Sequence, residues 1–338
     1  MGIEGFENAL RGELENAGIA GAAWSITDRR SLLSASGFGL ASTERPGDPV
    51  LPETLFRIAS NTKITVTLTA FQLREKGLIT LDEPVEHFFP GMNLSDRAAA
   101  GKITLRRLLS HTAGFPAEYT PDGVRDEDRS EEVLLRELDG LRLLSDPDEG
   151  RYLYSNLGIR LAAAALCRVG GKPFSELCRE YVLEPLGMDR SFFDLSRICT
   201  YPLALPHNAG PKVQHYVPIN AARYAAGGLF SNVEDMAKLA RLFLNRGAPL
   251  VSGSDWDEIT APAADMGLPE KSDYCLTLMR RHFGDVVLTG HTGSAPPYRS
   301  CIWVLPEKGL GVSFASNTEG GERFTNDLVP RIFIGEFT

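Results

Sequence analysis

The sequence predicts an α+β fold, an α/β/α sandwich in which the N- and C-terminal segments form one antiparallel sheet. Two observations predict it. Strand-like runs occur near both ends of the 338-residue chain, and the stretch between them reads as mostly helical. Helical patterns also flank the strands, and helices on both faces of a sheet bury it. With 43% apolar residues, the chain can fill a substantial core.

A helical middle between two strand-rich ends predicts an inserted lobe. We expect residues 1–80 and 225–338 to form the α/β lobe that carries the sheet. Residues 81–224 are expected to form a mainly helical lobe. The cleft between two such lobes is a natural place for a functional site.

Apolar spacing predicts the N-terminal elements. Phe6, Leu10 and Leu14 recur every four residues, as on one face of a short helix. The runs GAAWSITD and SLLSASGFGLAS, separated by the polar turn DRR, predict a β-hairpin. A long helix is predicted from about 60 to 76, with Gly77 just beyond its end.

Similar patterns predict the later elements. The run LGIRLAAAALCRVGG predicts a buried helix, and SNVEDMAKLARLFLNRG predicts another with Ser231 as N-cap and Glu234 completing a capping box. Strand patterns return in CLTLMRR, DVVLTGHTG and SCIWVLPEKGLGVSFASNT, where PEKG predicts a hairpin turn. A helix at about 321–335 is expected to close the chain.

Charge and cysteine content exclude several classes of protein. The net charge of −9 is spread without a basic block, which argues against nucleic acid and membrane surfaces as partners. Five scattered cysteines without a Cys-x-x-Cys pair indicate reduced thiols rather than disulfides or a zinc site. No signal peptide and no bilayer-spanning run of ~20 apolar residues is seen. We therefore expect a cytoplasmic protein without cofactor or metal.

Ser60 and Lys63 lie three residues apart where the long helix begins, so both side chains project from one face. An amine beside a serine hydroxyl can activate it as a nucleophile. Free N–H groups at a helix start also suit a developing oxyanion. An N-cap serine followed by an exposed lysine gives the same pattern, and this short motif alone does not separate the two.

Tyr154 and Asn156 stand in RYLYSNLG, on a polar turn before the buried helix. A tyrosine close to a lysine can shuttle protons, and the asparagine can hold a substrate carbonyl or the lysine. The alternative is a tyrosine packed under the loop, with Asn156 capping the helix. Tyr152 is a second candidate for the role of Tyr154.

His291, Thr292, Gly293 and Ser294 end a strand of β-branched residues. Two glycines leave its backbone bare on one side, so an extended substrate can pair with it. The backbone N–H of Ser294 can complete an oxyanion hole with that of Ser60. His291 fits three roles, as a hydrogen-bond donor, a proton relay or a surface residue.

These motifs, in this order, resemble the penicillin-recognising serine hydrolase superfamily, of the class C β-lactamase, D-alanyl-D-alanine carboxypeptidase and family VIII esterase type. The similar stretches are LFRIASNTKITVTLTAFQLREKGLITLDEPVEHFFPG, ITLRRLLSHTAGFP and AAGGLFSNVEDMAKLARLF, within about residues 10–335. The resemblance implies a β-lactamase/transpeptidase-like fold, with the active site in the cleft of a single catalytic unit.

The resemblance also implies roles for the residues. Ser60 would attack a carbonyl to give an acyl-enzyme, which water then hydrolyses. Lys63 and Tyr154 would share the general-base and general-acid work, in an order that is disputed for related enzymes. Asn156 would orient Lys63 and the substrate, and the N–H groups of Ser60 and Ser294 would form the oxyanion hole.

Two departures from the family pattern bear on the substrate. Class C β-lactamases carry Lys-Thr-Gly where this chain has His291, and a mostly neutral histidine offers no fixed cation to a β-lactam carboxylate. Absence of an export signal favours a cytoplasmic enzyme. His111, in SHTAG, is placed by the resemblance in a structural loop. Specificity is expected to lie in the loops 116–130 and 200–222.

The leading hypothesis is a serine hydrolase acting on an ester or amide of a small molecule or short peptide. It would be a carboxylesterase, a D-amino-acid amidase or peptidase, or DD-peptidase-like. One alternative is an acyltransferase with a non-water acceptor. Another is a weak β-lactamase or a non-catalytic penicillin-binding module. The sequence leaves open the natural substrate, the oligomeric state and the order of proton transfers.

Overall fold

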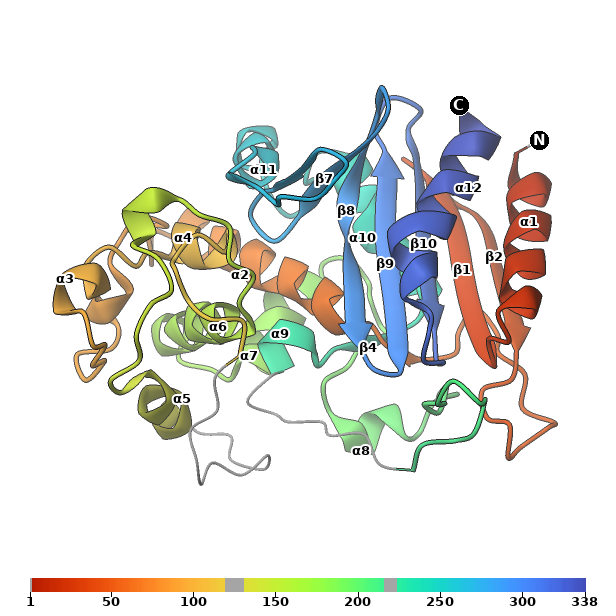
Figure 1. The fold of residues 1–338 in the computed structure, drawn as a ribbon, viewed down its shortest axis with the longest axis horizontal. Helices are drawn as coiled ribbons and strands as arrows, with labels where there is room; N and C mark the ends of the chain where they lie inside the picture. Colours follow the sequence, from red (N-terminus) through yellow and green to blue (C-terminus); the bar gives the residue numbers. More distant parts are fainter. Residues whose placement is uncertain (1, 119–130, 216–223) are drawn as a thin grey trace.

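The computed structural model describes residues 2–118, 131–215 and 224–338. A sheet with its covering helices lies beside a helical part (Figure 1). The predicted α+β class is confirmed, because eight antiparallel strands follow the order β2-β1-β10-β9-β8-β7-β6-β5. These strands are β1 (Gly21–Asp28), β2 (Leu32–Gly39), β5 (Ala264–Asp265), β6 (Ser272–Tyr274), β7 (Met279–Phe283), β8 (Val286–Ala295), β9 (Tyr298–Leu305) and β10 (Leu310–Ser316).

The two ends of the chain meet inside the sheet. β1 pairs with β10, with Trp24 opposite Phe314, so the N-terminal hairpin joins the C-terminal strands. The predicted hairpin turn PEKG connects β9 to β10. β1, β9 and β10 are buried along almost their whole length, as expected for strands covered on both faces.

Helices cover both faces of the sheet. On one face, α1 (Ile3–Asn16), the π-helical turn η6 (Phe324–Leu328) and α12 (Val329–Phe337) pack with the sheet residues Trp24 and Trp303. α1 and α12 also contact each other, and the two chain ends lie close together in Figure 1. On the other face, α10 (Val233–Leu244) packs on β10, where a Cβ at Gly311 would lie 3.1 Å from Ala240 Cβ.

The helical part continues the core of the sheet part. One buried cluster runs from Val304 in the sheet to Leu161 among the helices. The remaining elements are β3 (Phe56–Arg57), η1 (Ala59–Thr62), α2 (Lys63–Glu75), η2 (Val85–His87), α3 (Arg97–Ala100), α4 (Leu105–Leu109), α5 (Glu131–Leu138), η3 (Pro147–Glu149), α6 (Asn156–Gly170), α7 (Phe174–Cys178), η4 (Arg179–Leu183), α8 (Leu195–Ile198), α9 (Tyr224–Gly227), β4 (Phe230–Ser231) and α11 (Gly253–Thr260).

The division into lobes at residues 80/81 and 224/225 stays a prediction. All strands of the eight-stranded sheet lie outside 81–224, as that division expects. However, α2, which precedes residue 81, packs against α6, α7 and α9 of the helical part. α2 therefore lies at the junction, and its N-terminal end faces the sheet.

The predicted N-cap Ser231 and the alternative in which Asn156 caps a helix are each wrong by one residue. α10 is capped by Asn232, which accepts the N–H of Asp235, because Ser231 is held in β4. α6 is capped by Ser155, which accepts the N–H of Gly158 at 3.0 Å. Asn156 is therefore not the cap, and its side-chain amide is directed elsewhere.

None of the helices in the described ranges is long and apolar enough to cross a bilayer. The five cysteines are free thiols. Among the described residues, no group of three or more histidine, cysteine or carboxylate side chains is arranged to hold a metal ion.

Candidate active site

Ser60 lies in a tight turn at the start of α2. The preceding residue, Ala59, has φ of 49°, which is uncommon for a residue with a side chain. The predicted helix begins as the 3-10 turn η1 and becomes α-helical only at Lys63. Ser60 makes no cap bond; instead its Oγ accepts hydrogen bonds from Lys63 Nζ at 2.9 Å and Tyr154 OH at 2.8 Å. The alternative of a purely capping serine is therefore wrong.

Lys63 is fully buried, and its pKa is low. Its Nζ donates to Ala226 O at 2.5 Å and lies 5.0 Å from the centroid of the Tyr154 ring. Burial lowers the pKa of Lys63 from 10.5 to about 7, and the charge of Glu118 opposes this shift. A large fraction of Lys63 is thus the free amine at neutral pH, which is the form that can accept a proton.

Tyr154 keeps its proton. Burial raises the pKa of Tyr154, and the hydrogen bond with Ser60 offsets only part of that rise. The phenol is therefore a donor to Ser60 Oγ at neutral pH. Burial thus shifts the pKa values of Lys63 and Tyr154 in opposite directions, so that Lys63 is suited to be a base and Tyr154 an acid.

Gly293 lets strand β8 lie directly against the turn that carries Ser60. A Cβ at Gly293 would lie 2.2 Å from Ile58 O and 2.3 Å from Ser300 Oγ. Ser300 Oγ in turn donates to Ile58 O at 2.6 Å. The glycine therefore sets the spacing between η1 and β8, the two segments whose N–H groups were predicted to form an oxyanion hole.

The end of β8 has the open edge that the sequence predicts. The pairing of β7 with β8 stops at Met279, the first residue of β7, opposite Gly290, whereas β9 pairs with β8 as far as Ala295. Within the described ranges, the edge of 291–295 that faces away from β9 has no strand partner. An extended substrate segment could therefore add to it.

We expect Gly293→Ala to destabilise the fold by about 1–3 kcal/mol, the usual cost of forcing extra volume into a packed interior. The added methyl group would press on backbone atoms that cannot move away cheaply. The urea unfolding midpoint measures the effect. Gly12→Ala in α1 is the control, because a Cβ there meets nothing within 4 Å. Equal midpoints for Gly293→Ala and wild type would contradict the close approach.

A cavity of about 260 Å³ opens beside Ser60. Of the predicted site residues, Ser60, Asn156 and Ser294 line it. Asn156 Nδ2 donates to Glu118 Oε1 at 2.5 Å, so the amide points toward the cavity wall rather than to the helix end. The full lining is Arg57, Ala59, Ser60, Glu118, Asn156, Ala226, Gly227, Ser294, Ala295 and Pro296.

His291 lies behind this cavity and is 1% exposed. Its Nδ1 is 2.5 Å from Thr292 O, and because a carbonyl only accepts, Nδ1 carries the proton. Its Nε2 then accepts from Tyr274 OH at 3.1 Å. Burial, aided by the charge of Lys63, lowers the pKa of His291 to about 3. Both nitrogens are engaged and the ring is neutral, so contact with a substrate stays a prediction.

Three side chains at the site were not singled out from the sequence. Arg57 and Glu118 line the cavity, and Tyr274 holds His291. Glu118 shortly follows the family-like stretch that ends in GFP, so its place near the site could have been inferred. Arg57 lies within the family-like stretch that contains Ser60, so it too could have been inferred, whereas Tyr274 carries no local signal. Residues 119–130 and 216–222 of the two predicted specificity loops lie outside the described residues.

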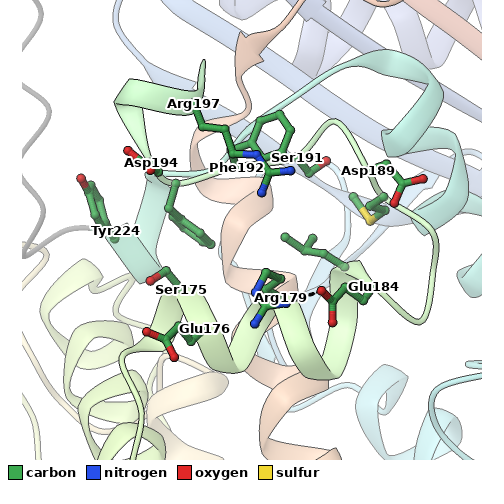
Figure 2. A pocket seen from close by; sticks show the side chains of 13 residues that line it. Ser175, Glu176, Arg179, Glu184, Asp189, Ser191, Phe192, Asp194, Arg197 and Tyr224 are labelled. Carbon is green, nitrogen blue, oxygen red and sulfur yellow. Dashed lines mark hydrogen bonds and ion pairs between the residues drawn. The ribbon is translucent and has the colours of Figure 1, made fainter. Parts of the chain in front are cut away.

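A larger cavity, of about 510 Å³, is formed by residues 175–197 and Tyr224 (Figure 2). Arg179 and Glu184 pair with each other on its wall, and Ser191 donates to Asp235 at 2.9 Å. No lysine or histidine is among its lining residues in the described ranges. Since none of its lining serines in the described ranges meets both a lysine and a tyrosine, as Ser60 does, we assign the chemistry to the smaller cavity at Ser60.

Comparison with known proteins places the chain in a family. The β-lactamase family matches residues 6–335. The β-lactamase-like protein 2 of Dictyostelium discoideum is 28% identical over 76% of this chain and 48% of its own length. Penicillin-binding protein 4 of Amycolatopsis lactamdurans is 25% identical over 97% of this chain and 88% of its own length.

The D-alanyl-D-alanine-carboxypeptidase/endopeptidase AmpH of Escherichia coli K12 is 28% identical over 60% of this chain. The chain spans only 48%, 61% and 52% of the first three curated relatives. The octameric penicillin-binding protein homologue from Pyrococcus abyssi has a TM-score of 0.88 at 25% identity, over 99% of this chain and 78% of that one.

A class C β-lactamase from Rhodobacter sphaeroides has the same fold, with a TM-score of 0.80 at 21% identity over 97% of this chain and 96% of that one. The family match covers nearly the whole chain, and the fold agrees along the same length. The chain belongs to the β-lactamase family of serine hydrolases.

Proposed function

We propose that this protein is a serine hydrolase that forms an acyl-enzyme on Ser60 and hydrolyses it. The observation that carries the proposal is the pair of hydrogen bonds to Ser60 Oγ, from Lys63 Nζ at 2.9 Å and Tyr154 OH at 2.8 Å. A nucleophile, a base and an acid thus meet at one oxygen on the wall of a cavity.

Acylation begins with Lys63 as the free amine. In the free-amine form the Ser60 hydroxyl donates to the Nζ lone pair, so Nζ accepts the Ser60 proton while Oγ attacks the carbonyl carbon. The bond to Ala226 O holds the amine in place. The N–H groups of Ser60 and Ser294 bind the oxyanion that forms. As the intermediate collapses, Tyr154 gives its proton to the leaving oxygen or nitrogen, and the Lys63 ammonium returns a proton to the phenolate.

Deacylation repeats these transfers with water in place of the leaving group. Lys63 accepts a proton from the attacking water, and Ser60 Oγ regains its proton from Tyr154 as the intermediate collapses. The Lys63 ammonium then returns a proton to the Tyr154 phenolate, which restores the resting enzyme. The depressed pKa of Lys63 and the raised pKa of Tyr154 support this order, because each group rests in the protonation state that its first transfer needs.

The substrate we propose is an ester or amide of a small molecule or short peptide. The cavity of about 260 Å³ suits a compact acyl group, and the open edge of β8 suits an extended segment. A neutral His291 offers no cation for a β-lactam carboxylate, which disfavours β-lactam hydrolysis. The relative named as a carboxypeptidase/endopeptidase supports a peptide-like substrate.

The test is intact-mass spectrometry of the protein after incubation with p-nitrophenyl esters, D-amino-acid amides and β-lactams. We expect an added acyl mass that maps to Ser60 and disappears with turnover. Addition of an amine or alcohol acceptor distinguishes an acyltransferase, because the acceptor would then capture the acyl group in competition with water. Absence of any adduct across the panel, together with absence of labelling by a fluorophosphonate, would reject the proposal.

We expect kcat/KM for a neutral ester to rise with pH around about 7 and then level off. Below the pKa of Lys63 the base is protonated and inactive, and above it the amine is free. His291, with a pKa of about 3, does not titrate in this range. The measurement is a rate profile from about pH 5 to about pH 9 on enzyme that stays folded. A rate that falls with pH through neutrality would contradict this assignment.

A further inference from the structure

His111 lies against Tyr154 in a region that the mechanism above does not use. It is 2% exposed, and its backbone φ is 57°. Its carbonyl accepts the N–H of Leu153 at 2.8 Å, and its Nδ1 accepts the N–H of Ser155 at 3.2 Å. One residue therefore binds the backbone on both sides of Tyr154.

The His111 ring also contacts the ring of Tyr154, with centroids 4.4 Å apart. Tyr274 lies on the His111 ring with centroids 4.8 Å apart and meets Tyr154 edge-on at 6.4 Å. Tyr274 is in turn fixed by the hydrogen bond from its hydroxyl to His291 Nε2. These four side chains, His111, Tyr154, Tyr274 and His291, form a group that we call the aromatic wall.

The aromatic wall limits how the Tyr154 side chain can turn. The bonds from His111 fix the backbone at residues 153 and 155 but leave the Tyr154 side-chain torsions free. The rings of His111 and Tyr274 occupy the space beside the phenol, so they restrict it to the orientation in which its hydroxyl reaches Ser60 Oγ. His111 is neutral, because Nδ1 must keep a lone pair to accept the Ser155 N–H.

We propose that His111 and Tyr274 are positioning residues that hold the Tyr154 hydroxyl on Ser60, and that His291 acts through Tyr274 rather than on the substrate. This inference rests on the proposed proton transfer by Tyr154. In this proposal His291 supports Tyr274 inside the protein and does not contact the substrate. The burial of His291 and the hydrogen bonds at both of its ring nitrogens support this role.

Three variants test the proposal. His111→Gly keeps the left-handed backbone but loses both the ring and the acceptor. His111→Asn also tolerates that backbone, and its Oδ1 can accept the Ser155 N–H, so it should recover part of the activity. Tyr274→Phe keeps the ring and loses the bond to His291. We expect kcat to fall about 100-fold in His111→Gly, as for a misplacement of about 1 Å, with KM changed much less.

The deciding measurement repeats His111→Gly in a Tyr154→Phe background. If His111 acts through the Tyr154 hydroxyl, the second change adds little once that hydroxyl is gone, so the effects are strongly non-additive. Tyr274→Phe is likewise measured both alone and combined with Tyr154→Phe. A loss of kcat that is the same in both backgrounds indicates a general structural role and overturns the proposal.

Fluorophosphonate labelling and thermal unfolding are followed for every variant. Suppose that wild type is labelled at Ser60 and that His111→Gly and Tyr274→Phe turn over at the wild-type rate. This result rejects the positioning role but leaves the proposed function intact. Wild type that fails to label rejects the proposed function and the positioning role with it. Should His111→Gly unfold, Tyr274→Phe carries the same comparison, since it keeps its ring against His111 and Tyr154.

Discussion

Ser60→Ala should abolish acylation and lower kcat/KM by about 10⁴–10⁶-fold, the range seen when an activated serine is removed from a hydrolase. Ser60 Oγ is the atom on which Lys63 and Tyr154 converge, and no other serine lines the cavity with a base beside it. The residual rate would come from binding and from the backbone N–H groups alone. Intact-mass spectrometry and initial rates measure the loss.

The fold of Ser60→Ala should survive. Its Oγ caps no helix, and its removal leaves the Tyr154 hydroxyl without an acceptor, which costs about 1–3 kcal/mol when no water replaces it. Ser175→Ala is a matched control, because Ser175 lines the larger cavity of about 510 Å³. We expect Ser175→Ala to keep full turnover. Full turnover in Ser60→Ala, or loss of turnover in Ser175→Ala, would move the active site away from Ser60.

Local pattern predicted the long strands of the sheet and its covering helices, but not the short strands β5 and β6. Alternating or continuous apolar runs mark β1 and β8 to β10, and apolar residues every four positions mark α1, because these elements bury one face or both. Helix starts were less predictable. Ser231 fits a cap by sequence, but its pairing with Phe56, far away in the chain, keeps it in a strand.

Some residues of the candidate site could be predicted from the sequence, and others could not. Ser60, Lys63 and Tyr154 belong to short motifs with a recognisable order, and Lys63 Nζ and Tyr154 OH each lie within hydrogen-bond distance of Ser60 Oγ. Tyr274 could not have been found from the sequence, because a single tyrosine before a strand carries no pattern. Tyr274 contacts His111 because β6 lies close to the segment that carries His111, and only the folded chain brings these two segments together.

The roles of Gly290 and Gly293 in β8 also depend on contacts that the sequence does not reveal. From sequence they indicated an open backbone for a substrate. In the structure, a Cβ added at Gly290 would lie 1.8 Å from Ile302 O, and one added at Gly293 would lie 2.2 Å from Ile58 O. Both glycines permit close contacts that sequence spacing does not record. The open edge arises instead because the pairing of β7 with β8 stops at Gly290.

Lys63→Met should lower kcat by about 10³–10⁴-fold and at the same time leave the fold as stable as wild type or more stable. Removal of the proposed base gives the loss of rate. Methionine is unbranched and apolar, so it fills the fully buried site of Lys63 without the cost of desolvating an amine. Tyr154→Phe is the companion variant, which keeps the ring against His111 and loses only the hydroxyl.

The two variants should differ in their pH profiles. Tyr154→Phe retains Lys63, so its residual kcat/KM should still rise around about pH 7, whereas Lys63→Met should lose that rise. Steady-state rates over the same pH range as for wild type provide the comparison. A rise near neutrality that persists in Lys63→Met would show that another group is the titrating base.

Stability provides an independent check on Lys63, with a defined sign. Its pKa is about 7 in the fold and 10.5 in the unfolded chain, so between these values the unfolded state binds more protons. Wild-type stability should therefore rise with pH across this interval, and the penalty for burying Lys63 is fully present below about pH 7. The stability gain of Lys63→Met over wild type should be largest there and shrink toward pH 10.5. Urea unfolding at several pH values measures it, and a gain that does not change with pH would mean that Lys63 is not held neutral by burial.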